Sequence, residues 1–221
     1  MSFIIDPPIR ISFSVANMWE RNYRWEAIQA LKHEHSMPTS EAMAHGTERH
    51  ESWENETRET GIIPSVFGYD WSIKPEVKRV VDLGNGVHLV VKTDGLCGKI
   101  KPEFVIDYKT SISKDKEKHS GQWLGTKQLP LYCAAFKCSV GYIFHEWIRG
   151  NRVKITTSKR LVSNDDKRDG IDWCVGIALD IHSFCIDNNE IWWPKVELEQ
   201  TQIQADVFSD ELEVEEEDDY S

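Results

Sequence analysis

The sequence lacks the features that mark membrane-spanning, secreted and metal-cluster proteins. No stretch approaches the roughly 18 consecutive apolar residues of a membrane-spanning helix. The opening residues, MSFIIDPPIR, have no basic segment before their short apolar run, so we expect no secretory signal. The five cysteines are scattered and form no CxxC pair, which predicts free thiols in a reducing cytoplasm and argues against a zinc or iron–sulfur site.

The chain also lacks an overall basic excess, since 26 Lys and Arg face 37 Asp and Glu, for a net charge of −11. Eight of these acids lie within residues 210–219, and the net charge without them is −3. Between Lys92 and Lys127 there are eight Lys and five acids. A near-neutral body with a mildly basic centre is compatible with DNA binding. The acidic tail, predicted to be disordered, could mimic DNA, bind a partner or only maintain solubility.

The hydrophobic pattern predicts a mixed sheet flanked by helices, which is an α/β (α+β) fold. Ser-capped and amphipathic segments predict helices at 12–32, 40–60, 127–138 and 169–187. Alternating or apolar runs predict strands at 76–83, 87–95, 104–111, 140–148 and 152–157, with hairpin turns at 84–86 and at Gly150-Asn151. The polar segment 113–125 is expected to be a mobile loop, and residues 61–70 are expected to form a loop.

Charged residues stand at the ends of two central strands. Asp94 closes one predicted strand, and Asp107 and Lys109 close the next, in FVIDYKTS. Residues two positions apart on a strand lie on the same face. Two carboxylates that converge from neighbouring strand ends repel each other, and a hard divalent cation such as Mg²⁺ relieves that repulsion. Such an ion polarises a phosphodiester, and a neighbouring Lys stabilises the developing negative charge.

Each of these residues has a simpler interpretation when it is taken alone. Asp107 and Lys109 could form an exposed pair on an edge strand, and Asp94-Gly95 could be a turn. His50 could be a solvated histidine. Glu76, on the preceding strand, could be an extra ligand or an exposed strand carboxylate. The order of several motifs along the chain therefore carries more weight than any one of them.

That order resembles the PD-(D/E)XK nuclease superfamily, and specifically its RecB-like exonuclease branch. The resemblance covers about residues 11–148 and includes an N-terminal helix followed by four motifs, which are Gly46-x-x-x-His50, Asp94, Asp107-Tyr-Lys109-Thr110 and Gln128-x-x-x-Tyr132. It implies a restriction-endonuclease-like core, with residues 1–208 as a single domain and 209–221 as the acidic tail. Phage recombination exonucleases and CRISPR-associated RecB-like nucleases share these motifs.

The resemblance also implies roles for individual residues. One or two Mg²⁺ or Mn²⁺ ions would be held by His50, Asp94, Asp107 and the backbone carbonyl of Tyr108. The catalytic set would be Asp94, Asp107, Lys109, Gln128 and Tyr132. Substrate contacts are expected at Thr110, Trp123 and Lys127. No iron–sulfur cluster is expected, because Cys174 and Cys185 do not match the cysteine pattern of cluster-bearing members.

The implied activity is a divalent-metal-dependent DNA nuclease, most simply an exonuclease on linear DNA in phage or bacterial recombination or repair. Two alternatives stay open, a catalytically silent DNA-binding or assembly module of the same fold and an endonuclease or branch-specific nuclease. The implied partners are DNA and a single-strand-binding or annealing recombination protein, in the cytoplasm of a bacterial host cell if the chain is phage-encoded, and a homo-oligomer is compatible. One departure is Val91, where the family has Gly, and we expect it to alter the local path of the strand.

Overall fold

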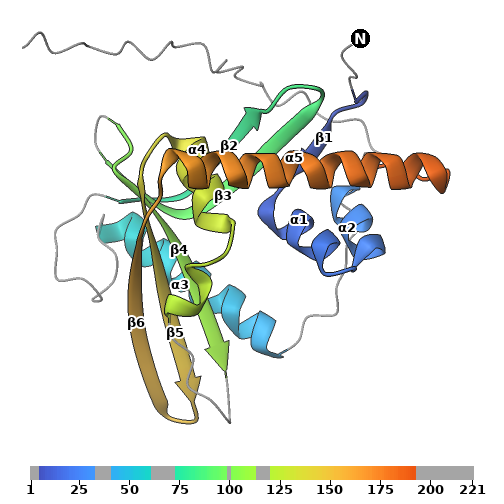
Figure 1. Cartoon of the computed structure of the whole chain (residues 1–221). Coiled ribbons are helices and arrows are strands. Elements are labelled where there is room, and N and C mark those ends of the chain that lie inside the picture. The colour runs from blue at the N-terminus through green and yellow to red at the C-terminus, as the bar shows by residue number, and fades with distance from the viewer. Residues whose placement is uncertain (1–4, 33–40, 61–72, 99–100, 113–119, 193–221) are drawn as a thin grey trace, which may run out of the picture.

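A computed structural model describes residues 5–32, 41–60, 73–98, 101–112 and 120–192 of the chain (Figure 1). Two predictions lie outside the described residues, namely the loop at 61–70 and the acidic tail at 209–221. Residues 113–119 of the predicted mobile loop lie outside them as well.

The predicted mixed sheet is confirmed, with six strands where the sequence predicted five. They are β1 (Ile9–Ile11), β2 (Ile73–Asp82), β3 (Val87–Cys97), β4 (Phe104–Ile112), β5 (Val140–Arg149) and β6 (Arg152–Leu161). The order across the sheet is β1-β3-β4-β5-β6, and β2 also pairs with β3. The pairs β1–β3 and β4–β5 are parallel, whereas β2–β3, β3–β4 and β5–β6 are antiparallel. The predicted turn at Gly150-Asn151 joins β5 to β6.

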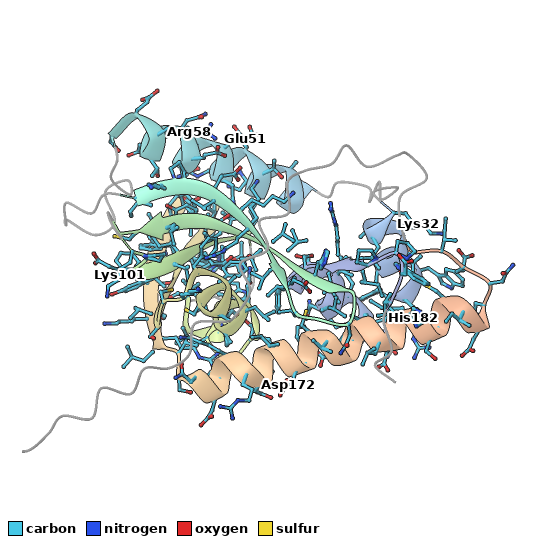
Figure 2. The ribbon with its side chains drawn as sticks, turned by 90° about the horizontal axis from the view of Figure 1, so that it is seen from above. Lys32, Glu51, Arg58, Lys101, Asp172 and His182 are labelled. Atoms are coloured by element: carbon cyan, nitrogen blue, oxygen red, sulfur yellow. The ribbon has the colours of Figure 1, made fainter. Side chains whose placement is uncertain are left out.

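Helices cover both faces of this sheet. Figure 2 shows α3, marked by Glu51 and Arg58, on one side of the strands and α5, marked by Asp172 and His182, on the other. The helices are α1 (Phe13–Glu20), α2 (Arg24–Leu31), α3 (Glu41–Thr60), α4 (Gln128–Phe136) and α5 (Asn164–Asp187). A short 3₁₀ helix, η1 (Ser120–Trp123), lies in the segment predicted as a loop. Helix α4 packs on α5 and on β4 and β5, so it lies on the α5 side.

Alternate residues of β4 enter two separate apolar clusters. Ile106 and Tyr108 pack with Trp53 of α3, whereas Val105 packs with Leu129 of α4. Because side chains alternate along a strand, the odd-numbered residues of β4 face α4 and the even-numbered residues face α3. Asp107 and Lys109 therefore lie on the α4 face, which is the face that matters for the site below.

The N-terminal region differs from the prediction in two ways. The single helix expected at 12–32 is two helices, capped at its start by Ser12 as expected and interrupted at Asn22, whose φ of 64° is left-handed. Asn tolerates this conformation better than most residues, and it ends α1 before the chain re-enters α2. Strand β1 was not predicted, because three residues are too few to show a hydrophobic period.

The last helix begins at Asn164 and not at residue 169. Ser163 accepts a hydrogen bond from the Asp166 backbone N–H, and the Asp166 carboxylate accepts one from the Ser163 N–H in return. This capping box satisfies two backbone donors that a helix start leaves open. It was missed because the third residue after the serine is Asp, where the usual pattern has Glu or Gln.

The state of the cysteines and the character of the helices can be compared with the sequence analysis. All five cysteines are buried free thiols, as predicted. None of the helices in the described ranges has the length and apolar character needed to cross a membrane.

Candidate active site

The two predicted carboxylates flank the point where β3 and β4 separate. The ladder between these strands joins Gly95 to Ile106 and continues to Cys97 and Phe104. Asp94 and Asp107 come next in this register, just beyond the ladder. There the Asp94 side chain replaces a strand partner, since its Oδ2 accepts a hydrogen bond of 2.6 Å from the Tyr108 backbone N–H. The sheet therefore opens at the two acids.

Asp107 is almost fully buried and has a partner at each oxygen. Oδ1 accepts a hydrogen bond of 2.8 Å from Gln128 Nε2, and Oδ2 lies 2.7 Å from Lys109 Nζ. Burial raises the pKa of Asp107 to about 6, and the charge of Asp94 contributes to the increase, whereas Lys109 opposes it. Because the ionised form of this carboxyl group is destabilised by burial, a further cation beside it would be bound favourably.

The Gln128-x-x-x-Tyr132 motif supports Asp107 from α4. Gln128 begins the helix, and its Nε2 also donates to the Tyr132 hydroxyl at 2.9 Å, one helical turn away. Burial raises the pKa of Tyr132, so the phenol stays protonated at neutral pH. Pro130 lies in the first turn of α4, where a helix tolerates proline.

The Gly46-x-x-x-His50 motif approaches from the opposite face of the sheet. A Cβ atom on Gly46 would lie 2.9 Å from Thr110 Oγ1, so only glycine lets α3 pack this closely on β4. One turn later, His50 Nδ1 lies 3.7 Å from Asp94 Oδ1. The opening between β3 and β4 thus lets residues from both faces of the sheet reach the same pair of acids.

An ion pair between the half-buried Arg49 and the buried Glu146, which the sequence analysis did not predict, holds α3 to β5. Arg49 donates through Nε and a terminal nitrogen to the two oxygens of Glu146, each at 2.8 Å. Glu146 is only 2% exposed, and the Arg49 guanidinium also lies over the Trp53 ring. The one available signal was a Glu inside the apolar strand VGYIFHEWI, which requires a cationic partner.

The residues predicted to contact substrate all have contacts within the protein. Thr110 lies on the α3 face against Gly46, away from Asp107 and Lys109. Lys127 forms an ion pair with Asp169 of α5. The half-buried Trp123 packs its ring against that of His145, with 4.5 Å between centroids. Each of these three side chains is therefore engaged with another part of the protein.

Glu76 lies on the strand that precedes the strand of Asp94, as expected, whereas Val91 does not alter the path of its strand. Glu76 stands opposite Asp94, between the pairs Pro75–Gly95 and Val77–Thr93, with a left-handed φ of 51°. Its carboxylate lies 2.6 Å from Lys92 Nζ. Val91 pairs regularly with Arg79. The strand irregularity expected at Val91 is therefore found on the neighbouring strand, at Glu76.

The donor groups suit a hard divalent cation in their chemistry, since two carboxylates and an imidazole converge and one carboxylate is destabilised by its surroundings. Within the described ranges, however, no three His, Cys, Asp or Glu side chains are gathered closely enough to hold a metal ion. The reason is visible in the contacts above, because Asp107 faces Lys109 and Gln128 while Asp94 binds the Tyr108 N–H. Metal binding would therefore require the acids to exchange some of these partners.

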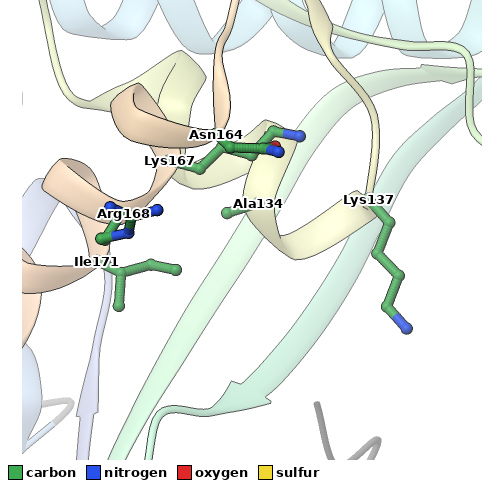
Figure 3. A pocket seen from close by; sticks show the side chains of 6 residues that line it. All are labelled: Ala134, Lys137, Asn164, Lys167, Arg168 and Ile171. Carbon is green, nitrogen blue, oxygen red and sulfur yellow. The ribbon is translucent and has the colours of Figure 1, made fainter. Parts of the chain in front are cut away.

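A pocket of about 350 Å³ lies elsewhere, between α4 and the start of α5 (Figure 3). It is lined by Ala134, Lys137, Asn164, Lys167, Arg168 and Ile171. None of the predicted site residues borders it, so the pocket is separate from the candidate active site.

No family model and no curated protein matches the sequence. Solved structures do match the fold. A phage-related exonuclease from Haemophilus somnus 129PT is 14% identical, with a TM-score of 0.51 over 83% of this chain and 97% of its own. A predicted exonuclease from Eubacterium rectale is 12% identical, with a TM-score of 0.50 over 82% of each chain. The chain therefore has the same fold as these two structures.

Proposed function

We propose that the protein is a divalent-metal-dependent DNA nuclease, and specifically an exonuclease that acts on linear DNA. The observation that carries the proposal is the position of Asp94, Asp107 and Lys109 at the opening between β3 and β4. The fold supports a nuclease in general. The more specific assignment is supported by the names of the two similar structures, both of which are described as exonucleases.

His50, Asp94 and Asp107, with the Tyr108 carbonyl, would hold Mg²⁺ or Mn²⁺. A bound ion of this kind supplies Lewis-acid polarisation of the phosphodiester and lowers the pKa of an attacking water. Lys109 places a fixed positive charge beside Asp107, where it would stabilise the negative charge that develops on the phosphate. Gln128 fixes the orientation of the Asp107 carboxylate, and Tyr132 accepts the second hydrogen bond of Gln128.

The proposal is tested by incubating the full chain with linear duplex DNA labelled at the 5′ or the 3′ end. Degradation should require added Mg²⁺ or Mn²⁺, stop with EDTA and spare a closed circular substrate. Asp107→Ala and Lys109→Ala should each abolish it. A matched control is the exposed pair Asp165 and Arg168, whose replacement by Ala should leave the rate unchanged.

Other outcomes would replace the proposal. Degradation by Asp107→Ala at the unmutated rate would show that these acids are not the site. Nicking of the closed circle would indicate an endonuclease or branch-specific enzyme. Tight DNA binding with no cleavage under any metal would indicate a catalytically silent module of the same fold.

A further inference from the structure

One stretch of this acidic chain contains no acid at all. Residues 147–164 include five cations and neither Asp nor Glu. They form the end of β5, the turn at Gly150-Asn151 and all of β6, which is an edge strand of the sheet. In Figure 1 the turn between β5 and β6 lies at the bottom of the view, at the far end of the hairpin from α4.

Strand register assigns the cations of this hairpin to faces. Lys109 pairs with His145, and His145 with Thr156, so these three side chains share the face of Asp107. Counting by twos along each strand places Arg149, Arg152 and Lys154 on that same face. Lys159 lies on the opposite face, where its ammonium stands over the Tyr142 ring.

Two arginines at the outer end of the hairpin differ from the arginine at its inner end in their ion pairs. Arg160, at the inner end, donates to Asp166 and to the carbonyl of Thr126, so it has a structural role. At the outer end Arg149, Arg152 and Lys154 are all exposed. Across the described residues, no ion pair joins Arg149 or Arg152 to an acid.

Strand geometry gives the separation from the catalytic pair. Lys154 is two strands across and two residues along from Lys109, which is about 12 Å, and Arg152 is about 16 Å away. One strand of duplex DNA carries a phosphate about every 3.4 Å of axis. The nearest of the three cations therefore lies about four nucleotides from the acids along a DNA strand. All three lie on the same surface as the acids.

We propose that Arg149, Arg152 and Lys154 form a basic arm that binds the phosphate backbone of the DNA being cleaved. The inference rests on the proposed function, which supplies the substrate. A nucleic-acid backbone fits better than an acidic protein, because the same face of β6 otherwise carries only the polar Thr156 and Ser158 beside Arg160, and a protein partner would need an apolar centre.

The test compares DNA affinity in EDTA, where cleavage is suppressed, for two triple variants that lose the same charge. The arm variant is Arg149→Gln/Arg152→Gln/Lys154→Gln. The control is Arg58→Gln/Lys159→Gln/Arg168→Gln, which leaves the arm intact. Fluorescence anisotropy with a labelled 20-base-pair duplex across a salt series should show the arm variant binding at least tenfold more weakly. Its slope of log affinity against log salt should fall by about 2 to 3, while the control stays near the unmutated chain.

Equal binding by the arm variant, the control and the unmutated chain would overturn the arm while leaving the nuclease proposal standing. If the unmutated chain binds no DNA and degrades none with metal, both proposals fail together. Should the triple variant not fold, Lys154→Gln against Lys159→Gln gives the same comparison on one strand. These two lysines differ in the face they occupy, so equal affinity would again refute the arm.

Discussion

Lys109 Nζ lies 2.7 Å from Asp107 Oδ2, and yet this ion pair does not keep the carboxyl group at its ordinary acidity. Burial raises the pKa of Asp107 from 3.8 to about 6. A raised carboxyl pKa means that the folded protein holds this proton more tightly than the unfolded chain does. The associated stability is fully present below about pH 4 and is lost as the pH rises through 6.

Asp107→Asn should therefore stabilise the metal-free protein at high pH, because it removes a buried ionised carboxylate. At pH 8 in EDTA we expect a free energy of unfolding about 1–3 kcal/mol above that of the unmutated chain. The difference should shrink as the pH approaches 5. Urea denaturation of both proteins across this range measures it, and a difference that stays constant with pH would contradict the assignment.

Gln128→Leu should reduce cleavage by about tenfold to a hundredfold, because it removes the amide that donates to the buried Asp107 oxygen. It should also raise the pKa of Asp107 further, so the acidic limb of the pH–rate profile moves to higher pH. Tyr132→Phe removes only the acceptor of the second amide hydrogen and should cost a few-fold at most. Equal losses from the two variants, with no change in the pH profile, would show that Gln128 does not act through Asp107.

Arg49→Met should destabilise the fold by about 3–5 kcal/mol, because it leaves the Glu146 carboxylate buried without a partner. Replacing both residues, in Arg49→Met/Glu146→Leu, should recover most of that loss. Arg168→Met, which breaks the exposed pair with Asp165, should change stability by less than about 0.5 kcal/mol. The denaturant midpoints of the three variants measure these differences. If Arg49→Met is as stable as Arg168→Met, the pair between Arg49 and Glu146 is dispensable for stability.

The parts of the site that could be predicted are those that depend on the spacing of residues close together in the sequence. Asp107 and Lys109 lie on one face because strand side chains alternate, and Gln128 and Tyr132 meet because helix residues four apart are neighbours. The starts of β3 and β4 likewise follow from their apolar runs. Each of these relationships depends on a few consecutive residues, so it can be inferred directly from the sequence.

What could not be predicted depends on residues far apart in the chain. The opening between β3 and β4 arises because the Asp94 carboxylate binds the Tyr108 N–H, and no local pattern indicates that contact. The Arg49–Glu146 pair spans 97 residues. The break at Asn22 was hidden because the apolar spacing of 12–32 continues through it, and a single left-handed residue leaves that spacing nearly unchanged.

Gly46→Ala tests whether the Gly-x-x-x-His motif is a steric requirement. Alanine in place of glycine within a helix normally gains about 1 kcal/mol, but here its Cβ would stand 2.9 Å from Thr110 Oγ1. Because threonine is branched at Cβ, its hydroxyl cannot move away freely. Gly46→Ala should therefore bring no gain in the unmutated chain and should stabilise by about 1 kcal/mol in a Thr110→Ala background. Thermal unfolding of the four proteins gives the coupling, and identical effects of Gly46→Ala in both backgrounds would show that α3 does not depend on this close approach to position His50.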